Sequence, residues 1–163
     1  MDTPWQVLIE DVRGIVFSDG PPGASTAAIQ LIDVDNVAAT PCLTDPAGWK
    51  TLKTIPWAGT AASFMSWLGR ALPTSAHLSV PIETAIGGRS GVGSDLSFTS
   101  VAPCASVAVT EWQAGNPLLI QNPNEPFHLV AIDVQGAVVL VCFFGRSSDF
   151  QGEQQFLSRL VFE

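Results

Sequence analysis

A serine, a histidine and a glutamate are the residues of this chain that could carry out hydrolysis, although they do not form a standard motif. Ser90 lies in the segment 88–92, which ends in valine and so lacks the last glycine of the G-x-S-x-G nucleophile elbow. His128 and Glu111 complete the non-standard set that an envelope hydrolase would use. His77 and His128 also fit a simpler role as hydrogen-bonded histidines on strands. We therefore predict no catalytic residue, and keep a hydrolase as an alternative.

The sequence also lacks the patterns of a metal or cofactor site. It contains no CxxC and no HxxxH pair, and only two histidines. The glycines of segment 91–96 do not complete the dinucleotide-binding fingerprint, because its third glycine is missing. We expect no metal and no cofactor, and interpret these glycines as a turn or bulge between strands.

Three cysteines allow two interpretations. Cys42 and Cys104 each follow a proline in a loop-like context, whereas Cys142 lies inside the apolar run 137–144. Either the first two form a disulfide and Cys142 is a buried thiol, or all three are free thiols. A disulfide closing a loop of about 60 residues would contribute roughly 4 kcal/mol in the chain-entropy model. The spacing alone does not decide between the two.

A ligand-binding surface is predicted in the segment 43–58, which is long for a loop inside a compact domain. It holds two tryptophans and both lysines of an otherwise acidic chain. The predicted ligand-binding residues are Trp49, Lys50, Lys53 and Trp57. Amphipathic rings beside cations favour an anionic or glycan-like ligand. In the alternative, the loop folds back and buries both rings against Phe64 and Leu68.

Composition narrows the class of protein. Apolar residues make up 47% of the 163 residues, a length that favours a single domain over 1–163. Seven Lys and Arg against fifteen Asp and Glu give a net charge of -8, so nucleic acid and anionic membranes are poor partners. The longest apolar run, 137–144, is too short to span a bilayer, and we expect no membrane insertion by this chain. The N-terminal residues lack a signal-peptide pattern, so either the protein is cytosolic or its export signal lies outside this chain.

The hydrophobic pattern predicts an α+β fold, an antiparallel β-sheet with two main helices packed on it. Apolar residues at helical spacing indicate a helix from Thr60 to Leu72, stopped by Pro73. A second helix is predicted to begin near Ser147–Asp149. Strands are expected at 7–9, 14–17, 27–35, 77–80, around 87–88, 97–98 and 107–112, and as a hairpin over 127–144 that turns at Gln135–Gly136. Residues 36–57 are interpreted as irregular.

Three phrases carry a resemblance to a known family. They are Ile29–Cys42, Ser79–Gly91 and Leu129–Val141, in the order and at the spacing seen in extracytoplasmic domains of actinobacterial-type membrane-anchored proteins. The chain resembles the PsbP-like α+β sandwich of LpqN-type lipoproteins over 29–163, with 1–28 as an N-terminal strand or strands and a turn. The resemblance implies that Cys42 pairs with Cys104, and that a membrane segment or lipobox precedes the domain.

The function that follows is a non-enzymatic extracytoplasmic module that binds or senses a small ligand or an envelope protein. The resemblance brings no catalytic residue. The alternatives are the envelope hydrolase described above and a purely structural domain of a larger envelope protein.

Overall fold

A computed structural model gives the fold of the chain. It describes residues 6–11, 14–20, 27–45, 47–73, 76–98, 104, 106–113, 116–120, 127–145 and 155–162. The elements in chain order are β1 (Gln6–Asp11), β2 (Gly14–Ser18), β3 (Ala28–Val34), β4 (Asn36–Ala38), β5 (Cys42–Leu43), the 3₁₀ helix η1 (Gly48–Thr51), β6 (Thr54–Pro56), α1 (Ala61–Ala71), β7 (Ala76–Leu78), β8 (Ile82–Ile86), β9 (Arg89–Phe98), β10 (Ser106–Gln113), β11 (Asn116–Ile120), β12 (Phe127–Val134) and β13 (Ala137–Phe144).

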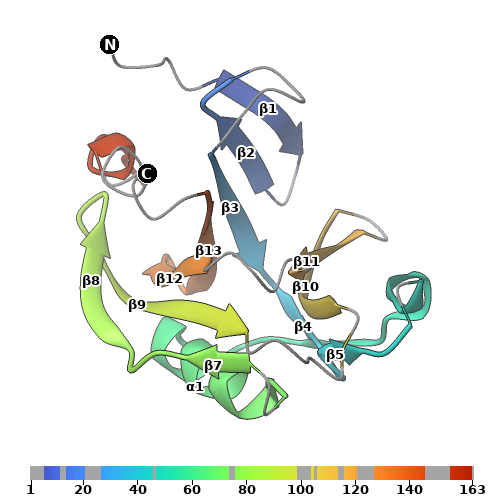
Figure 1. Cartoon of the computed structure of the whole chain (residues 1–163). Helices are drawn as coiled ribbons and strands as arrows, with labels where there is room; N and C mark the ends of the chain where they lie inside the picture. The colour runs from blue at the N-terminus through green and yellow to red at the C-terminus, as the bar shows by residue number, and fades with distance from the viewer. Residues whose placement is uncertain are drawn as a thin grey trace.

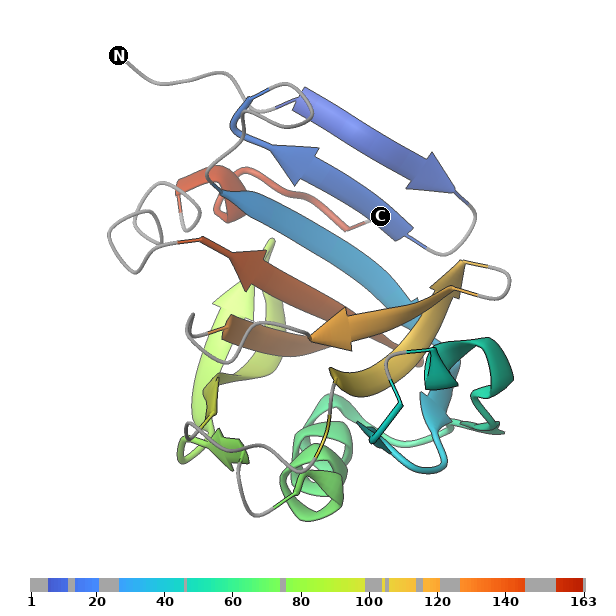
Figure 2. The same ribbon diagram turned by 45° about the vertical axis from the view of Figure 1, so that its right-hand side comes forward.

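Antiparallel sheet dominates the structure (Figure 1). The main sheet has eight strands in the order β1-β2-β3-β13-β12-β9-β7, and β8 pairs with β9 on the same side as β7. A three-stranded sheet, β11-β10-β5, and the pair β4-β6 complete the architecture. Figure 2 shows β10 and β11 crossing in front of the main sheet, with α1 below.

The hairpin at the centre of the main sheet is confirmed. β12 and β13 pair without a register shift from His128 opposite Phe143 to Val134 opposite Ala137. The two turn residues, Gln135 and Gly136, both have positive φ, 51° and 89°. This is the geometry that two-residue hairpin turns need to match the twist of the strands.

Both faces of this sheet are covered, as expected from two apolar runs without a polar side. On one face of β13, three side chains are buried beneath Phe64 and Leu68 of α1 and residues of β10. They are Val138, Leu140 and Cys142. On the other face, Val141 and Phe143 are buried beneath the C-terminal segment 155–162, which contributes Leu157. β13 therefore lies between two apolar layers, one beneath α1 and β10 and the other beneath the C-terminal segment.

Helix α1 matches the predicted helix closely. The Thr60 hydroxyl caps its N-terminus by accepting a hydrogen bond from the Ser63 backbone N–H at 3.3 Å. The carboxylate of Asp133 in β12 accepts a second one from the Ala61 N–H at 2.8 Å, which ties the helix to the sheet. Of the predicted C-terminal helix, residues 147–154 lie outside the described residues, and 155–157 are helical.

The described residues of 36–57 form more regular structure than the prediction of an irregular segment. β4 pairs with β6, β5 pairs with β10, and η1 lies between β5 and β6. The strands have only two or three residues each, so they are too short to show a period of two in the sequence. Long-range pairing, rather than local pattern, holds them in place.

Cys42 and Cys104 form a disulfide, with Cα atoms 5.1 Å apart. This confirms the pairing that the family resemblance implied. Cys142 is a buried free thiol on β13, also as predicted. Burial raises the pKa of the Cys142 thiol well above its usual value, so it stays protonated and unreactive.

Two glycines of β9 make different demands on the packing, and this gives a testable contrast. A Cβ on Gly91 would lie 2.5 Å from the Ala131 carbonyl oxygen and would also collide with Ile132, whereas one on Gly93 would be at ordinary contact distance, 3.5 Å from Val130. We expect Gly91→Ala to lower the free energy of unfolding by about 1–3 kcal/mol. Gly93→Ala should change it by less than about 1 kcal/mol. Urea unfolding of both variants checks this, and equal losses would contradict it.

Candidate functional site

The predicted ligand-binding segment folds around Trp49. The half-buried ring of Trp49 packs with Leu52 against a small apolar cluster of Ala38, Leu43 and Ala108. The ammonium of Lys50, which is exposed, lies 5.7 Å from the centroid of the Trp49 ring. This is a cation–π distance, and the packing fixes the orientation of the ring that the lysine covers.

Trp57 belongs to a different cluster. Its backbone N–H donates to the Asp35 carbonyl at 2.9 Å, and its ring lies 5.7 Å from Phe64 and 5.9 Å from Trp67 of α1. The ring is half-buried. Within the described part of the chain its indole N–H is buried without a hydrogen-bond partner, which typically costs about 1–3 kcal/mol.

The four predicted residues thus lie on one short stretch, η1 and β6 with their flanks, but the two rings support different parts of the core. Lys53 is exposed, and its carbonyl accepts a hydrogen bond from the Ala39 N–H at 2.8 Å. Beside it, β6 exposes Ile55 and Pro56 to solvent. Neither ring is fully buried or fully exposed, so the choice between ligand binding and core packing stays a prediction.

The structure keeps Ser90 and His128 of the hydrolase alternative apart. Asp95 is the β9 residue opposite His128, and Ser90 stands five residues away on the same strand. At the rise of an extended strand, five residues span about 16 Å. Glu111 lies on β10, which belongs to a separate sheet.

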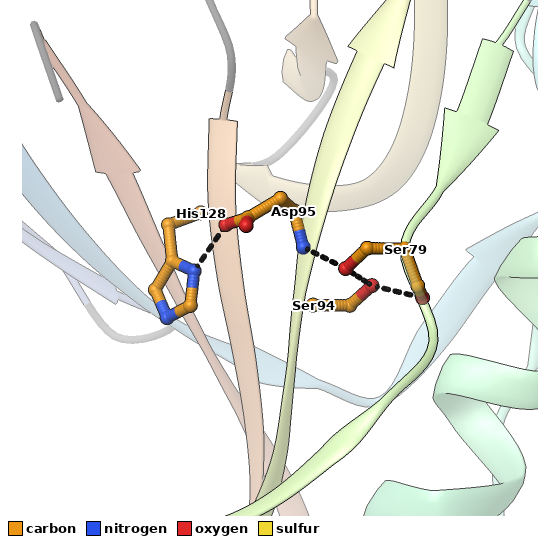
Figure 3. A network of polar contacts seen from close by, with 4 residues as sticks. All are labelled: Ser79, Ser94, Asp95 and His128. Atoms are coloured by element: carbon orange, nitrogen blue, oxygen red, sulfur yellow. Dashed lines mark hydrogen bonds and ion pairs between the residues drawn. The ribbon is translucent and has the colours of Figure 1, made fainter.

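His128 instead takes part in a network that the sequence analysis missed (Figure 3). Its Nδ1 lies 2.6 Å from Asp95 Oδ1. The Asp95 N–H donates to Ser79 Oγ at 2.9 Å, and the Ser94 hydroxyl donates to the Ser79 carbonyl at 2.7 Å. The four residues come from three separate parts of the chain, and only the strand register places them side by side.

This network is not a catalytic triad. Ser94 and Asp95 are consecutive in β9, so their side chains point to opposite faces of the sheet. The Ser79 hydroxyl lies 3.1 Å from the Ser94 hydroxyl, on the far side of β9 from the imidazole of His128 (Figure 3). The hydrogen bonds of Ser79 to both backbone groups of Asp95 fasten the chain between β7 and β8 to the sheet.

The described residues contain no group of three His, Cys, Asp or Glu side chains that could hold a metal ion. Among the helices of the same residues, none has the length and apolar character needed to cross a membrane.

Comparison with known proteins leaves the family open. No family model and no curated protein matches this chain. A crystal structure of PA94, a protein of unknown function from Pseudomonas aeruginosa, is 15% identical, with a TM-score of 0.49 over 94% of this chain and 85% of that one. The solution structure of cyanobacterial PsbP from Synechocystis sp. PCC 6803 is 12% identical, with a TM-score of 0.40 over 94% and 76%. Likenesses this low assign neither a family nor a function to this chain.

Proposed function

We propose that this protein is a non-enzymatic binding module that works outside the cytoplasm, as a domain of a membrane-anchored or LpqN-type envelope protein. The disulfide between Cys42 and Cys104 supports the compartment, because disulfides persist in oxidising environments and are rare in the cytosol. The separation of Ser90 from His128 supports a role without catalysis.

The observation that carries the binding role is the cation–π pair on η1. Lys50 and Lys53 are the only lysines of the chain, and both are exposed. Lys50 covers Trp49, whose ring is held by its apolar cluster. An aromatic ring with one cation over it, and a second exposed lysine three residues further along the chain, suits a ligand that combines a flat sugar face with negative charge. Asp45 lies nearby, but its carboxylate accepts a hydrogen bond from the Ala47 N–H at 2.8 Å.

Titration with dextran sulfate, with neutral dextran as the matched probe, tests this function. We expect dextran sulfate to change tryptophan fluorescence saturably and to shift the amide resonances of η1 and β6. Lys50→Gln and Lys53→Gln should each weaken binding by about tenfold, the equivalent of roughly 1.4 kcal/mol.

The control variant is Arg70→Gln, because Arg70 lies at the end of α1 and donates to Ser66 Oγ at 2.7 Å. It removes the same charge from another part of the surface and should leave the affinity unchanged. If all three variants bind equally, the interaction is non-specific. If neither probe binds, the ligand surface on η1 and β6 is wrong.

A further inference from the structure

Exposed apolar side chains gather along one edge of the main sheet, around β8. Ile82, the first residue of β8, is 70% exposed, and Val80, two residues before the strand, is 83% exposed. Val161 is 79% exposed, and its neighbours Leu160 and Phe162 approach Gly87 at the other end. Figure 1 shows β8 at the margin of the molecule, with the C-terminal segment beside its tip. Single exposed apolar residues are common, so these side chains point to an interaction site only together with the unused backbone groups of β8.

The local pairing explains why Ile82 stays exposed. Its partner across the ladder in β9 is Gly93, which offers no side chain to pack against it. The C-terminal segment covers the same face further along, where Ile86 is buried. The exposure therefore follows from the sequence of β9.

The outer side of β8 also has unused backbone groups. In the described part of the chain β8 pairs with β9 alone. The turn that joins β8 to β9 has two residues, Gly87 and Gly88, so Ile86 and Arg89 on either side of it form a hydrogen-bonded pair. Further along the antiparallel ladder, pairs that are hydrogen-bonded alternate with pairs that are not. Counting back, the N–H and C=O groups of Glu83 and Ala85 point away from β9, toward the open edge.

We infer that the outer edge of β8 binds an extended strand of a partner polypeptide. The backbone of Glu83 and Ala85 would supply hydrogen bonds, and Val80 and Ile82 would contact apolar residues of the added strand. Glu83 is exposed and is the one charged residue of β8, so it selects a strand with Lys or Arg opposite it. A second copy of the chain fits less well, because it would bring another Glu83 to the same ladder and another net charge of -8.

The probe for this inference is a short acetylated and amidated peptide that alternates valine with threonine and carries a central lysine. We expect it to shift the amide resonances of β8 and to slow hydrogen exchange at Glu83 and Ala85. The same peptide with a central glutamate should bind several-fold more weakly, since like charges on adjacent strands repel. A version N-methylated at alternate amides should not bind, because it cannot form the ladder.

Two variants at one position separate the edge from the rest of the surface. Ala85→Pro removes an N–H that faces solvent, a place where an edge strand tolerates proline, and should abolish binding of the lysine peptide. Ala85→Val keeps the donor and should retain binding. The inference is overturned if the lysine peptide leaves Glu83 and Ala85 unprotected, or if the N-methylated peptide binds equally well. Protection of these amides by self-association of the protein alone would assign the edge to a second copy and overturn the partner strand.

Discussion

Aspartate at Leu140 or at Val141 is expected to unfold the protein. The two residues are adjacent in β13 and point to opposite faces, and both are fully buried, one in each apolar layer. A buried carboxylate without a partner costs at least about 3–5 kcal/mol, a large part of the stability of a domain of this size. Far-ultraviolet circular dichroism and urea unfolding of each variant measure the loss.

Ala137→Asp provides the control, because Ala137 begins the same strand and is exposed. It introduces the same carboxylate and should change the free energy of unfolding by less than about 0.5 kcal/mol. If Leu140→Asp unfolds the protein while Val141→Asp stays as stable as the control, the face beneath the C-terminal segment is open to water in solution. That result would contradict a sheet covered on both sides.

The central hairpin and the helix could be predicted because each carries its own local signal. The runs 127–134 and 137–144 are apolar on both faces and are separated by Gln135–Gly136, so pattern and turn agree. Residues 61–71 repeat apolar side chains at helical spacing between Thr60 and Pro73. In both cases neighbouring residues along the chain decide the structure.

The small sheets could not be predicted, since distant residues decide them. β4 is three residues long and buried, and Asn36 is held by Thr110 and Glu111 of β10 through hydrogen bonds of 2.7 and 3.0 Å. These partners lie more than 70 residues away in the sequence. No local pattern encodes such a contact.

The candidate site could be predicted only in part, because some of its features depend on local sequence and others on contacts between distant residues. The order of residues along the chain shows that both lysines and two tryptophans share one segment. It could not assign Trp49 and Trp57 to separate clusters, because Trp57 is placed by its packing on α1. The proximity of Asp95 and His128 depends on the register of β9 against β12, which a single sequence does not reveal.

Loss of the disulfide is the other large effect expected. Cys42 and Cys104 are 62 residues apart in the sequence, and closing a loop of that length should stabilise the fold by about 4 kcal/mol through the entropy of the unfolded chain. Cys104 is buried in the main core, and half-buried Cys42 packs against it, so alanine at both positions removes packing as well. We expect the double variant Cys42→Ala, Cys104→Ala to unfold at much lower urea concentration than the native protein.

Reductant separates the covalent contribution from the packing contribution. Dithiothreitol should lower the urea midpoint of the native protein and leave that of the double variant unchanged. Cys142→Ala, which removes a buried thiol outside the disulfide, should keep the sensitivity to dithiothreitol. An unchanged midpoint in native protein whose thiol count has risen by two would contradict the prediction.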